Sequence, residues 1–284
     1  MNIVNSVSSS HSTSGLHERV HIIPLGHEID RAVKPFLKHR ADRAYVITVS
    51  PTAELDLKML EKQKHFTQKV CEGLTKAGVE PTVLYCNLFD ILDSLRTVAS
   101  LIVQEKDQKH NEVFVNMSAC GRKTSIAVTL AAMVHGVEVY YVSADRYATG
   151  DAAGLELEHG LSIVEKGNIE PLYNFKIMMP DESSQKFLAE LHRRKEGMNS
   201  RDIFVHFQNE RVDGYENLPK TKKKGGDFAP GQLNRELLNR TNRKYLNPLE
   251  KAGYIRREWK GRSFIIHLTE SGKYIACASG LLEI

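Results

Sequence analysis

The residues best suited to chemistry in this chain lie in one short stretch, where a buried apolar run at residues 113–115 gives way to small, polar and basic residues. An apolar helical pattern then resumes, which predicts a parallel strand, a tight turn and a helix whose first turn carries free backbone N–H groups. Such a turn with cations beside it is suited to an anion, most often a phosphate. A plain strand-to-helix connection with a chance basic pair is an equally good interpretation. The turn contains Ser118, Gly121, Arg122, Lys123 and Thr124.

Two familiar phosphate motifs are absent from this turn. A Walker A loop has a glycine five residues before its Gly-Lys-Ser/Thr. Here Asn116 stands at that position, and Arg122 separates Gly121 from Lys123. The three spaced glycines of a dinucleotide fingerprint are also missing, so the sequence argues against a classical ATPase or dehydrogenase.

The elements that must position this turn alternate between strand and helix patterns. Strands separated by helices predict right-handed crossovers and a parallel sheet covered on both faces, which is a doubly wound, Rossmann-like α/β domain. The segment 143–170 has weak periodicity and is predicted to form a loop and hairpin over the same sheet edge. The predicted strands are 20–25, 44–49, 81–85, 113–115 and 137–142, and the predicted helices are 28–38, 53–77, 88–104 and the one that follows the turn.

The loop after the first strand meets the turn at the edge where parallel strands end. Gly26 permits a close approach there. His27 and Arg31 are candidates for ligand contact or for plain surface positions, with neither favoured. For Glu28 and Asp30 the favoured prediction is capping of the following helix.

Composition bounds the class of protein. The 284 residues suit two domains, and 41% hydrophobic with 26% charged residues suffices for a normal core. No apolar run approaches the roughly 20 residues that a bilayer span requires. The serine-rich start is predicted to be a disordered tail at residues 1–18 and does not resemble a signal peptide. These features predict a cytoplasmic protein without membrane contact.

Cysteine and histidine usage predicts neither disulfides nor a metal site. Cys71, Cys86, Cys120 and Cys277 lie far apart without a CxxC pair, and the 12 histidines are scattered. Cys120 lies in the candidate turn, where a small buried thiol is favoured over a nucleophile. We therefore expect no catalytic residue, no metal and no cofactor.

The net charge of +4 is divided unevenly along the chain. Residues 1–180 hold 19 Lys and Arg against 21 Asp and Glu, whereas residues 220–262 hold 13 against 4. Such concentration in a short region favours a polyanionic partner. The polar insertion 209–231 carries four of these lysines and is either an arm against DNA or a plain loop.

The second part reads as helix, helix, helix, hairpin and helix. Ser183 or Ser184 and then Ser200 are the predicted caps of the first two helices. A third helix at 233–252, offset near Thr241 and Pro248, ends at Gly253, and a hairpin at 254–268 turns at basic residues.

Together, these features resemble the CARF (CRISPR-associated Rossmann fold) regulators, most closely the archaeal subgroup with a C-terminal winged helix-turn-helix. The resemblance covers the chain after residue 18 and implies a ligand-binding domain at 19–179 and a DNA-binding domain at 180–284. It implies a homodimer that holds a cyclic oligoadenylate between paired loops. The implied ligand contacts are Gly26, His27, Ser118, Ala119, Cys120, Gly121, Arg122 and Lys123, with Thr124 beside them.

The winged-helix resemblance implies binding to double-stranded DNA. A recognition helix reads base edges in the major groove, and wing residues hold phosphates. Trp259 is predicted to pack under the wing. The predicted base contacts are Asn242, Arg243 and Arg240 with Lys244 beside them, and the predicted wing contacts are Arg256, Arg257, Lys260 and Arg262.

The expected function is that of a ligand-responsive transcription regulator. One alternative is a metal-independent ring nuclease that cuts cyclic oligoadenylate in the same pocket, with assistance from His27, Ser118 or Lys123. Another keeps the winged helix and assigns a different nucleotide or metabolite to the first domain.

Overall fold

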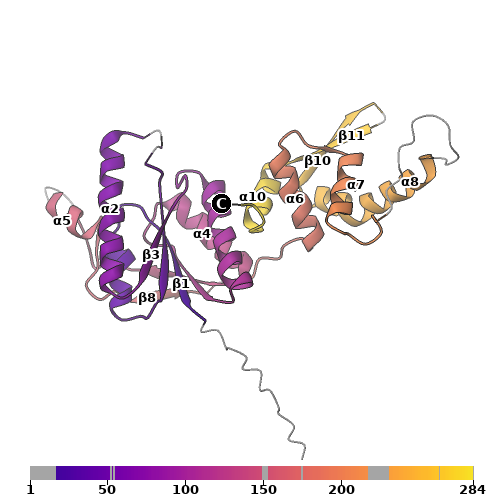
Figure 1. The fold of residues 1–284 in the computed structure, drawn as a ribbon. Helices are drawn as coiled ribbons and strands as arrows, with labels where there is room; N and C mark the ends of the chain where they lie inside the picture. The colour runs from indigo at the N-terminus through magenta and orange to yellow at the C-terminus, as the bar shows by residue number, and fades with distance from the viewer. Residues whose placement is uncertain are drawn as a thin grey trace, which may run out of the picture.

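The computed structural model describes residues 17–51, 53, 55–148, 153–173, 175–216, 230–261 and 263–283. Its first part is an α/β unit built on one six-stranded sheet, in the order β3-β2-β1-β4-β5-β8 (Figure 1). The first five are mutually parallel, as predicted, whereas β8 runs antiparallel to β5. The strands are β1 Arg19–Pro24, β2 Arg43–Thr48, β3 Glu80–Tyr85, β4 Glu112–Asn116, β5 Glu138–Val142 and β8 Ile169–Leu172.

The strand order creates a switch point between β1 and β4. The chain moves from β1 through β2 to β3 in one direction, and from β4 to β5 in the other. The loops that leave β1 and β4 therefore lead to helices on opposite faces of the sheet, and α/β sheets bind ligands at such a switch point.

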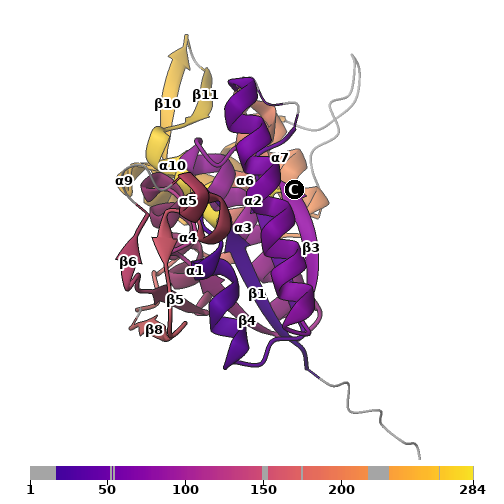
Figure 2. The same ribbon diagram turned by 90° about the vertical axis from the view of Figure 1, so that its left-hand side faces the viewer.

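Helices cover both faces of the sheet. α1 and α2 pack on one face over a core that includes Phe66, and α3 and α4 pack together on the other (Figure 2). The helices are α1 Asp30–Val33 with the 3₁₀ turn η1 Lys34–Leu37, α2 Leu57–Lys76, α3 Ile91–Ile102 with the π-helix η2 Val103–Gln108, and α4 Arg122–His135.

Helix starts differ from the sequence prediction because aspartate caps decide them. Asp56 accepts a hydrogen bond from the backbone N–H of Lys58, so α2 begins later than expected. Asp90 accepts from the backbone N–H groups of Leu92 and Asp93 and likewise starts α3. The helix predicted at 28–38 is a single α-turn followed by the 3₁₀ turn that contains Pro35.

The segment after β5 forms a strap across the sheet edge. Its two short strands pair antiparallel, which confirms the predicted hairpin, and it also contains a helix that the sequence did not predict. Its elements are β6 Arg146–Tyr147, α5 Ala153–His159 and β7 Ser162–Ile163.

The second part is a winged helix. The hairpin β10–β11 confirms the predicted wing, and β9 adds a short third strand that the sequence did not predict. The predicted irregularity near Thr241 is the π-helix η3. The elements are α6 Glu182–Arg194, β9 Met198–Asn199, α7 Ser200–Asn209, α8 Pro230–Thr241, η3 Asn242–Leu246, α9 Asn247–Lys251, β10 Ile255–Lys260, β11 Ser263–Leu268 and α10 Glu270–Ala278.

The predicted serine caps of this part are wrong by one to three residues. Asp181 caps α6 by accepting from the backbone N–H of Ser184. Asn199 caps α7 in a reciprocal capping box with Asp202. Most of the lysine-bearing insertion, residues 217–229, lies outside the described residues.

The two parts share one apolar core. It runs from the sheet through α3 and α4 into the winged helix, where α10 packs on α3 (Figure 1). The Ser100 hydroxyl donates to the backbone oxygen of Leu282 at 2.5 Å. His135, the last residue of α4, places its Nε2 2.9 Å from the backbone oxygen of Ala278 in α10.

Candidate functional site

The loops after β1 and β4 touch at the switch point. The backbone N–H of Gly26 donates to the carbonyl of Ala119 at 2.8 Å. A Cβ at position 26 would lie 3.5 Å from that oxygen and 3.6 Å from the Cα of Cys120, so the glycine sits in close contact with the turn. The sequence expectation that these two loops meet is therefore confirmed.

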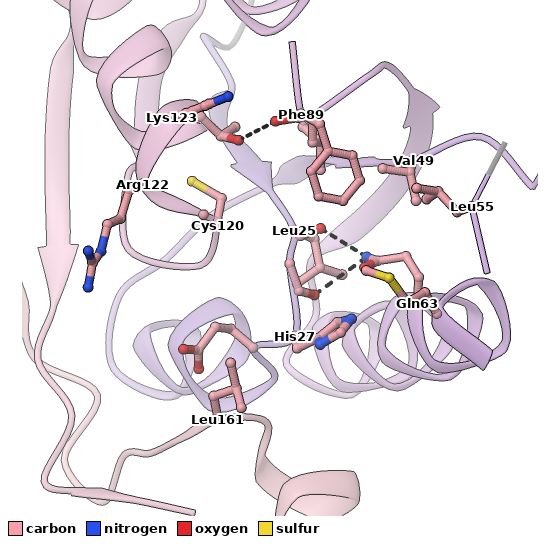
Figure 3. Close-up of a pocket in the computed structure, with 16 residues that line it drawn as sticks. Leu25, His27, Val49, Leu55, Gln63, Phe89, Cys120, Arg122, Lys123 and Leu161 are labelled. Carbon is pink, nitrogen blue, oxygen red and sulfur yellow. Dashed lines mark hydrogen bonds between the residues drawn. The ribbon is translucent and has the colours of Figure 1, made fainter. Parts of the chain in front are cut away.

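A cavity of about 520 Å³ opens beside this contact (Figure 3). Its rim is the first turn of α4, whose backbone N–H groups have no acceptor within the helix. Its opposite wall is largely apolar and includes Val49, Leu55 and Phe89. An apolar wall facing a cationic rim is suited to a ligand that joins a flat base to a phosphate.

The cations of the rim are free to meet a ligand. Arg122 and Lys123 are exposed, and neither pairs with an acidic side chain among the described residues. Figure 3 shows their side chains on different sides of the turn, with the Cys120 thiol between them. The first turn of α4 contains no acidic residue that would compete for them.

Ser118 and Ala119 form the buried base of the turn and do not line the cavity. The Ser118 hydroxyl donates to Asn116 Oδ1 at 2.7 Å and accepts from the backbone N–H of Val142 at 3.1 Å. The Ala119 side chain is fully buried. Thr124 lines the cavity but donates its hydroxyl to the carbonyl of Leu88 at 2.7 Å, which fixes the start of α4 to the β3–α3 loop.

The candidate nucleophile and the candidate base of the cavity are the Cys120 thiol and the His27 imidazole, and both are uncharged. Burial raises the pKa of the Cys120 thiol to about 12, so it remains protonated at neutral pH. His27 stacks on Phe66 with ring centroids 5.0 Å apart. Burial, together with the nearby Lys62 ammonium, lowers the pKa of His27, so the neutral imidazole faces the cavity.

Among the charged residues after β1, Arg31 bonds to the β4–α4 turn and to β5, whereas Glu28 and Asp30 bond to the strap. Arg31 is buried and donates to the carbonyl of Ser118 at 3.2 Å and to the Tyr141 hydroxyl at 3.0 Å. It does not line the cavity. The capping role expected for the two acids is wrong, because Glu28 accepts from the Ser162 hydroxyl at 2.8 Å and Asp30 accepts from the backbone N–H of Val164 at 3.0 Å.

Sequence reasoning missed Gln63 and Phe89. Gln63 lies on the buried face of α2 and donates to the carbonyl of Leu25 and to the Thr48 hydroxyl, each at 2.9 Å (Figure 3). Phe89 is 54% exposed and faces the cavity. An amide on the apolar face of a helix and an aromatic residue just before an aspartate cap were the signals available.

The surface formed by α8, η3 and α9 of the winged helix is rich in asparagine. Asn239, Asn242, Arg243 and Asn247 follow helical spacing and line a shallow cavity of about 320 Å³ with Trp259 of the wing. The predicted packing of Trp259 under the wing is wrong. Its side chain is 65% exposed and touches Phe264 only edge-on, at 5.4 Å between centroids.

Arg257 has a different environment from the other predicted wing cations. Its guanidinium pairs with Glu250 and donates to Asn242 Oδ1 at 3.2 Å and to Asn247 Oδ1 at 2.8 Å. Because Arg257 and the amide nitrogens are all donors, the amide oxygens must face the guanidinium. The Nδ2 donors of both asparagines are then left for another partner.

The remaining predicted DNA contacts are spread over the surface. Arg240 lies 3.5 Å from Asp213, and Lys244 lies over the ring of Tyr245. Lys260 is exposed near the wing tip. Arg256 is exposed on the opposite face of β10 from Arg257, and Arg262 lies outside the described residues.

The described residues contain neither a candidate metal site nor a helix that could span a membrane. No group of three or more His, Cys, Asp or Glu side chains there is placed to hold a metal ion. In the same part of the chain, no helix is long and apolar enough to cross a membrane.

Comparison with known families supports both parts of the fold. A family model described as HFX_2341-like, N-terminal, matches residues 19–147. A model described as the DUF6293 C-terminal winged helix domain matches residues 183–280. No curated protein matches the chain.

Solved structures give distant likenesses only. Csm6 from Enterococcus italicus bound to cyclic hexa-2′-fluoro-hexa-dAMP is 10% identical, covers 84% of this chain and 59% of its own, and has a TM-score of 0.39. Can2 from Sulfobacillus thermosulfidooxidans in complex with cyclic tetra-adenylate is 11% identical, with 91% and 63% covered and a TM-score of 0.37. The chain thus spans about three fifths of the length of these proteins. At these TM-scores the likenesses say nothing about what this chain binds.

Proposed function

We propose that the chain is a ligand-responsive DNA-binding regulator whose first domain, residues 19–179, senses a cyclic oligoadenylate or a related nucleotide. α4 runs from the cavity of the first domain to a contact with the winged helix. Its first turn carries the free cations Arg122 and Lys123, and its last residue, His135, contacts α10 of the winged helix. That single helix is the observation that carries the proposal, because a ligand at one end can bias the winged helix at the other.

The ligand class follows from the chemistry of the cavity. Free backbone N–H groups and two unpaired cations favour phosphate, and the wall with Phe89 and Val49 favours a nucleobase. A second copy of the chain, related by a two-fold axis, would double both features, as a cyclic ligand with repeated adenosines requires.

The DNA proposal rests on the surface around η3. Exposed Arg243 and the outward Nδ2 donors of Asn242 and Asn247 present hydrogen-bond donors to a base edge. Purine N7, guanine O6 and thymine O4 are the acceptors in the major groove. Lys244, Lys260 and Arg262 would hold phosphates, together with Arg240, whose ion pair with Asp213 is exposed and weak. Arg256 instead lines a cavity at the junction of the two domains.

Calorimetry with cyclic tetra-adenylate, followed by a mobility assay on duplexes enriched from random sequence, tests the proposal. We expect saturable ligand binding and a change in the affinity for the enriched duplex when ligand is present. A chain that binds ligand without any change in duplex affinity would contradict a regulatory role.

Ligand cleavage is a second candidate because the neutral His27 imidazole faces the cavity. A neutral imidazole can accept the proton of a ribose 2′-hydroxyl whose oxygen attacks the adjacent phosphate. The bond from phosphorus to the 5′-oxygen then breaks, the 5′-oxygen takes a proton from water, and a 2′,3′-cyclic phosphate remains. Incubation with labelled cyclic tetra-adenylate separates the two candidates. A sensor returns the ligand intact, whereas a ring nuclease yields linear products at a rate that His27→Ala abolishes.

A further inference from the structure

A second cavity, of about 740 Å³, lies where the winged helix meets the first domain. It shares no lining residue with the cavity beside α4. Its walls come from α6, β10, β11 and α10, and Leu92 in the first turn of α3 closes one side. Leu92 lies three residues after Phe89, so one loop and helix start border both cavities.

The charges that face this second cavity are unbalanced. Lys195, Arg256 and Lys273 line it against one carboxylate, Glu270. Glu270 is already paired with Lys273 at 2.7 Å. Lys195 and Arg256 have no acidic partner among the described residues, so two cations from different elements line this cavity without a counter-charge.

Two imidazoles, of His192 and His267, line the same cavity. His267 lies 3.1 Å from Glu258, and His192 lines the cavity between the helices. Burial lowers the pKa of His192, and Lys273, Arg96, Lys195 and Arg193 lower it further. An imidazole held among cations in this way would gain a favourable partner if an anion entered.

Lys195 lines the cavity and has a strained backbone conformation. Its φ of 59° and ψ of −39° place it at the centre of a γ-turn, in which the backbone N–H of Glu196 donates to the carbonyl of Arg194 at 2.6 Å. This kind of turn is rare, and a lysine there carries a cost that glycine would avoid. Strain of this type accumulates at sites that bind ligands.

We propose that this junction cavity binds a small phosphate-bearing molecule, with its phosphate between Lys195 and Arg256 and its remainder against Leu92. The first domain closes one side of the cavity, which suits a small ligand better than a rod-like duplex. A bound molecule would contact α3 and α6 together and so stabilise the arrangement of the two domains. This inference does not depend on DNA binding or on cyclic oligoadenylate.

Calorimetry on the full chain at constant ionic strength tests the site, with pyrophosphate and ADP as probes. The Arg122→Ala/Lys123→Ala chain serves as background, so that the first cavity does not contribute. We expect saturable binding that Lys195→Ala weakens about tenfold, as the loss of one charge-assisted contact predicts. Lys69→Ala, which removes an exposed lysine of α2, is the matched control and should change nothing.

Two further variants separate binding from folding. Lys195→Arg should retain binding, whereas Lys195→Gly should weaken it as much as Lys195→Ala does and raise the thermal stability, because glycine relieves the strained turn. The imidazole NMR signal of His192 should report a higher pKa when pyrophosphate is present. Absence of saturable binding by either probe, or equal loss in Lys69→Ala, would overturn the proposal. So would a Lys195→Ala chain that loses duplex binding but keeps pyrophosphate binding.

Discussion

The turn that starts α4 and the wing of the second domain both carry adjacent basic residues, but their surroundings differ. Arg122 and Lys123 are both exposed above a buried base whose polar groups bond to one another. In the wing, Arg256 is exposed whereas Arg257 is surrounded by Glu250, Asn242 and Asn247. Alternation along a strand sends neighbouring side chains to opposite faces, whereas neighbours at a helix start both reach solvent. Equal charge in the sequence therefore corresponds to two free cations in one place and to one free and one paired cation in the other.

The largest effect is expected at the turn. Arg122→Ala/Lys123→Ala removes two charge-assisted contacts to phosphate, each of about 1.5–3 kcal/mol. The affinity for cyclic tetra-adenylate should fall about 100-fold or more, while duplex affinity without ligand stays the same. Calorimetry and the mobility assay measure the two quantities. Equal ligand affinity in the variant and in the Lys69→Ala control would remove these cations from the site.

Acid should affect the buried interior beneath these surfaces. Burial, with the nearby Arg19 and His39, lowers the pKa of His21 from its usual 6.5 to about 3. The unfolded chain therefore binds the proton first, so stability is full above pH 6.5 and falls as the pH drops toward 3. The slope from this group is at most about 1.4 kcal/mol per pH unit. Denaturant titrations of the wild type and of His21→Gln at several pH values measure this slope. If the free energy of unfolding falls equally with pH in both proteins, the assignment of the slope to His21 is wrong.

Substitutions of Arg257 and of Lys260 in the wing should have opposite effects on duplex discrimination and on salt dependence. Arg257→Lys keeps the charge but loses the planar fork that orients Asn242 and Asn247. Discrimination between the enriched duplex and random duplex should fall about tenfold, with an unchanged salt dependence. Lys260→Ala should lower the slope of log affinity against log salt by about 0.9 and leave discrimination intact. If Arg257→Lys leaves discrimination intact, Arg257 does not orient the two asparagines.

The smallest effect concerns communication between the regions. His135→Ala removes the contact with the Ala278 carbonyl, which is one hydrogen bond of about 1 kcal/mol. The ligand-dependent change in duplex affinity should shrink about threefold to fivefold, with each separate affinity preserved. An unaltered change would show that coupling runs through other parts of the α3–α10 contact.

The sequence predicted those features that depend on local pattern. The alternation of strands and helices predicted the parallel sheet, and the turn predicted where Arg122 and Lys123 lie. It did not predict the roles of Arg31 and Arg257, because these depend on which carbonyls, carboxylates and amides other elements bring to the guanidinium. The anchoring of the strap was missed for the same reason, since Glu28 and Asp30 hold it through backbone N–H groups 134 residues away.

The set of residues that lines the junction cavity could not be predicted from the sequence. Lys195, Arg256 and Leu92 come from α6, β10 and α3, and no spacing along the chain brings them together. The unusual backbone conformation of Lys195 likewise could not be predicted from the sequence. Only the packing of the winged helix on α3 creates that site.

The most direct test of the central claim is the affinity of cyclic tetra-adenylate measured by calorimetry with and without a saturating amount of the enriched duplex. Coupling between two sites is reciprocal, so the account predicts that duplex changes ligand affinity by the same factor by which ligand changes duplex affinity. Identical ligand affinities in the two titrations would contradict it.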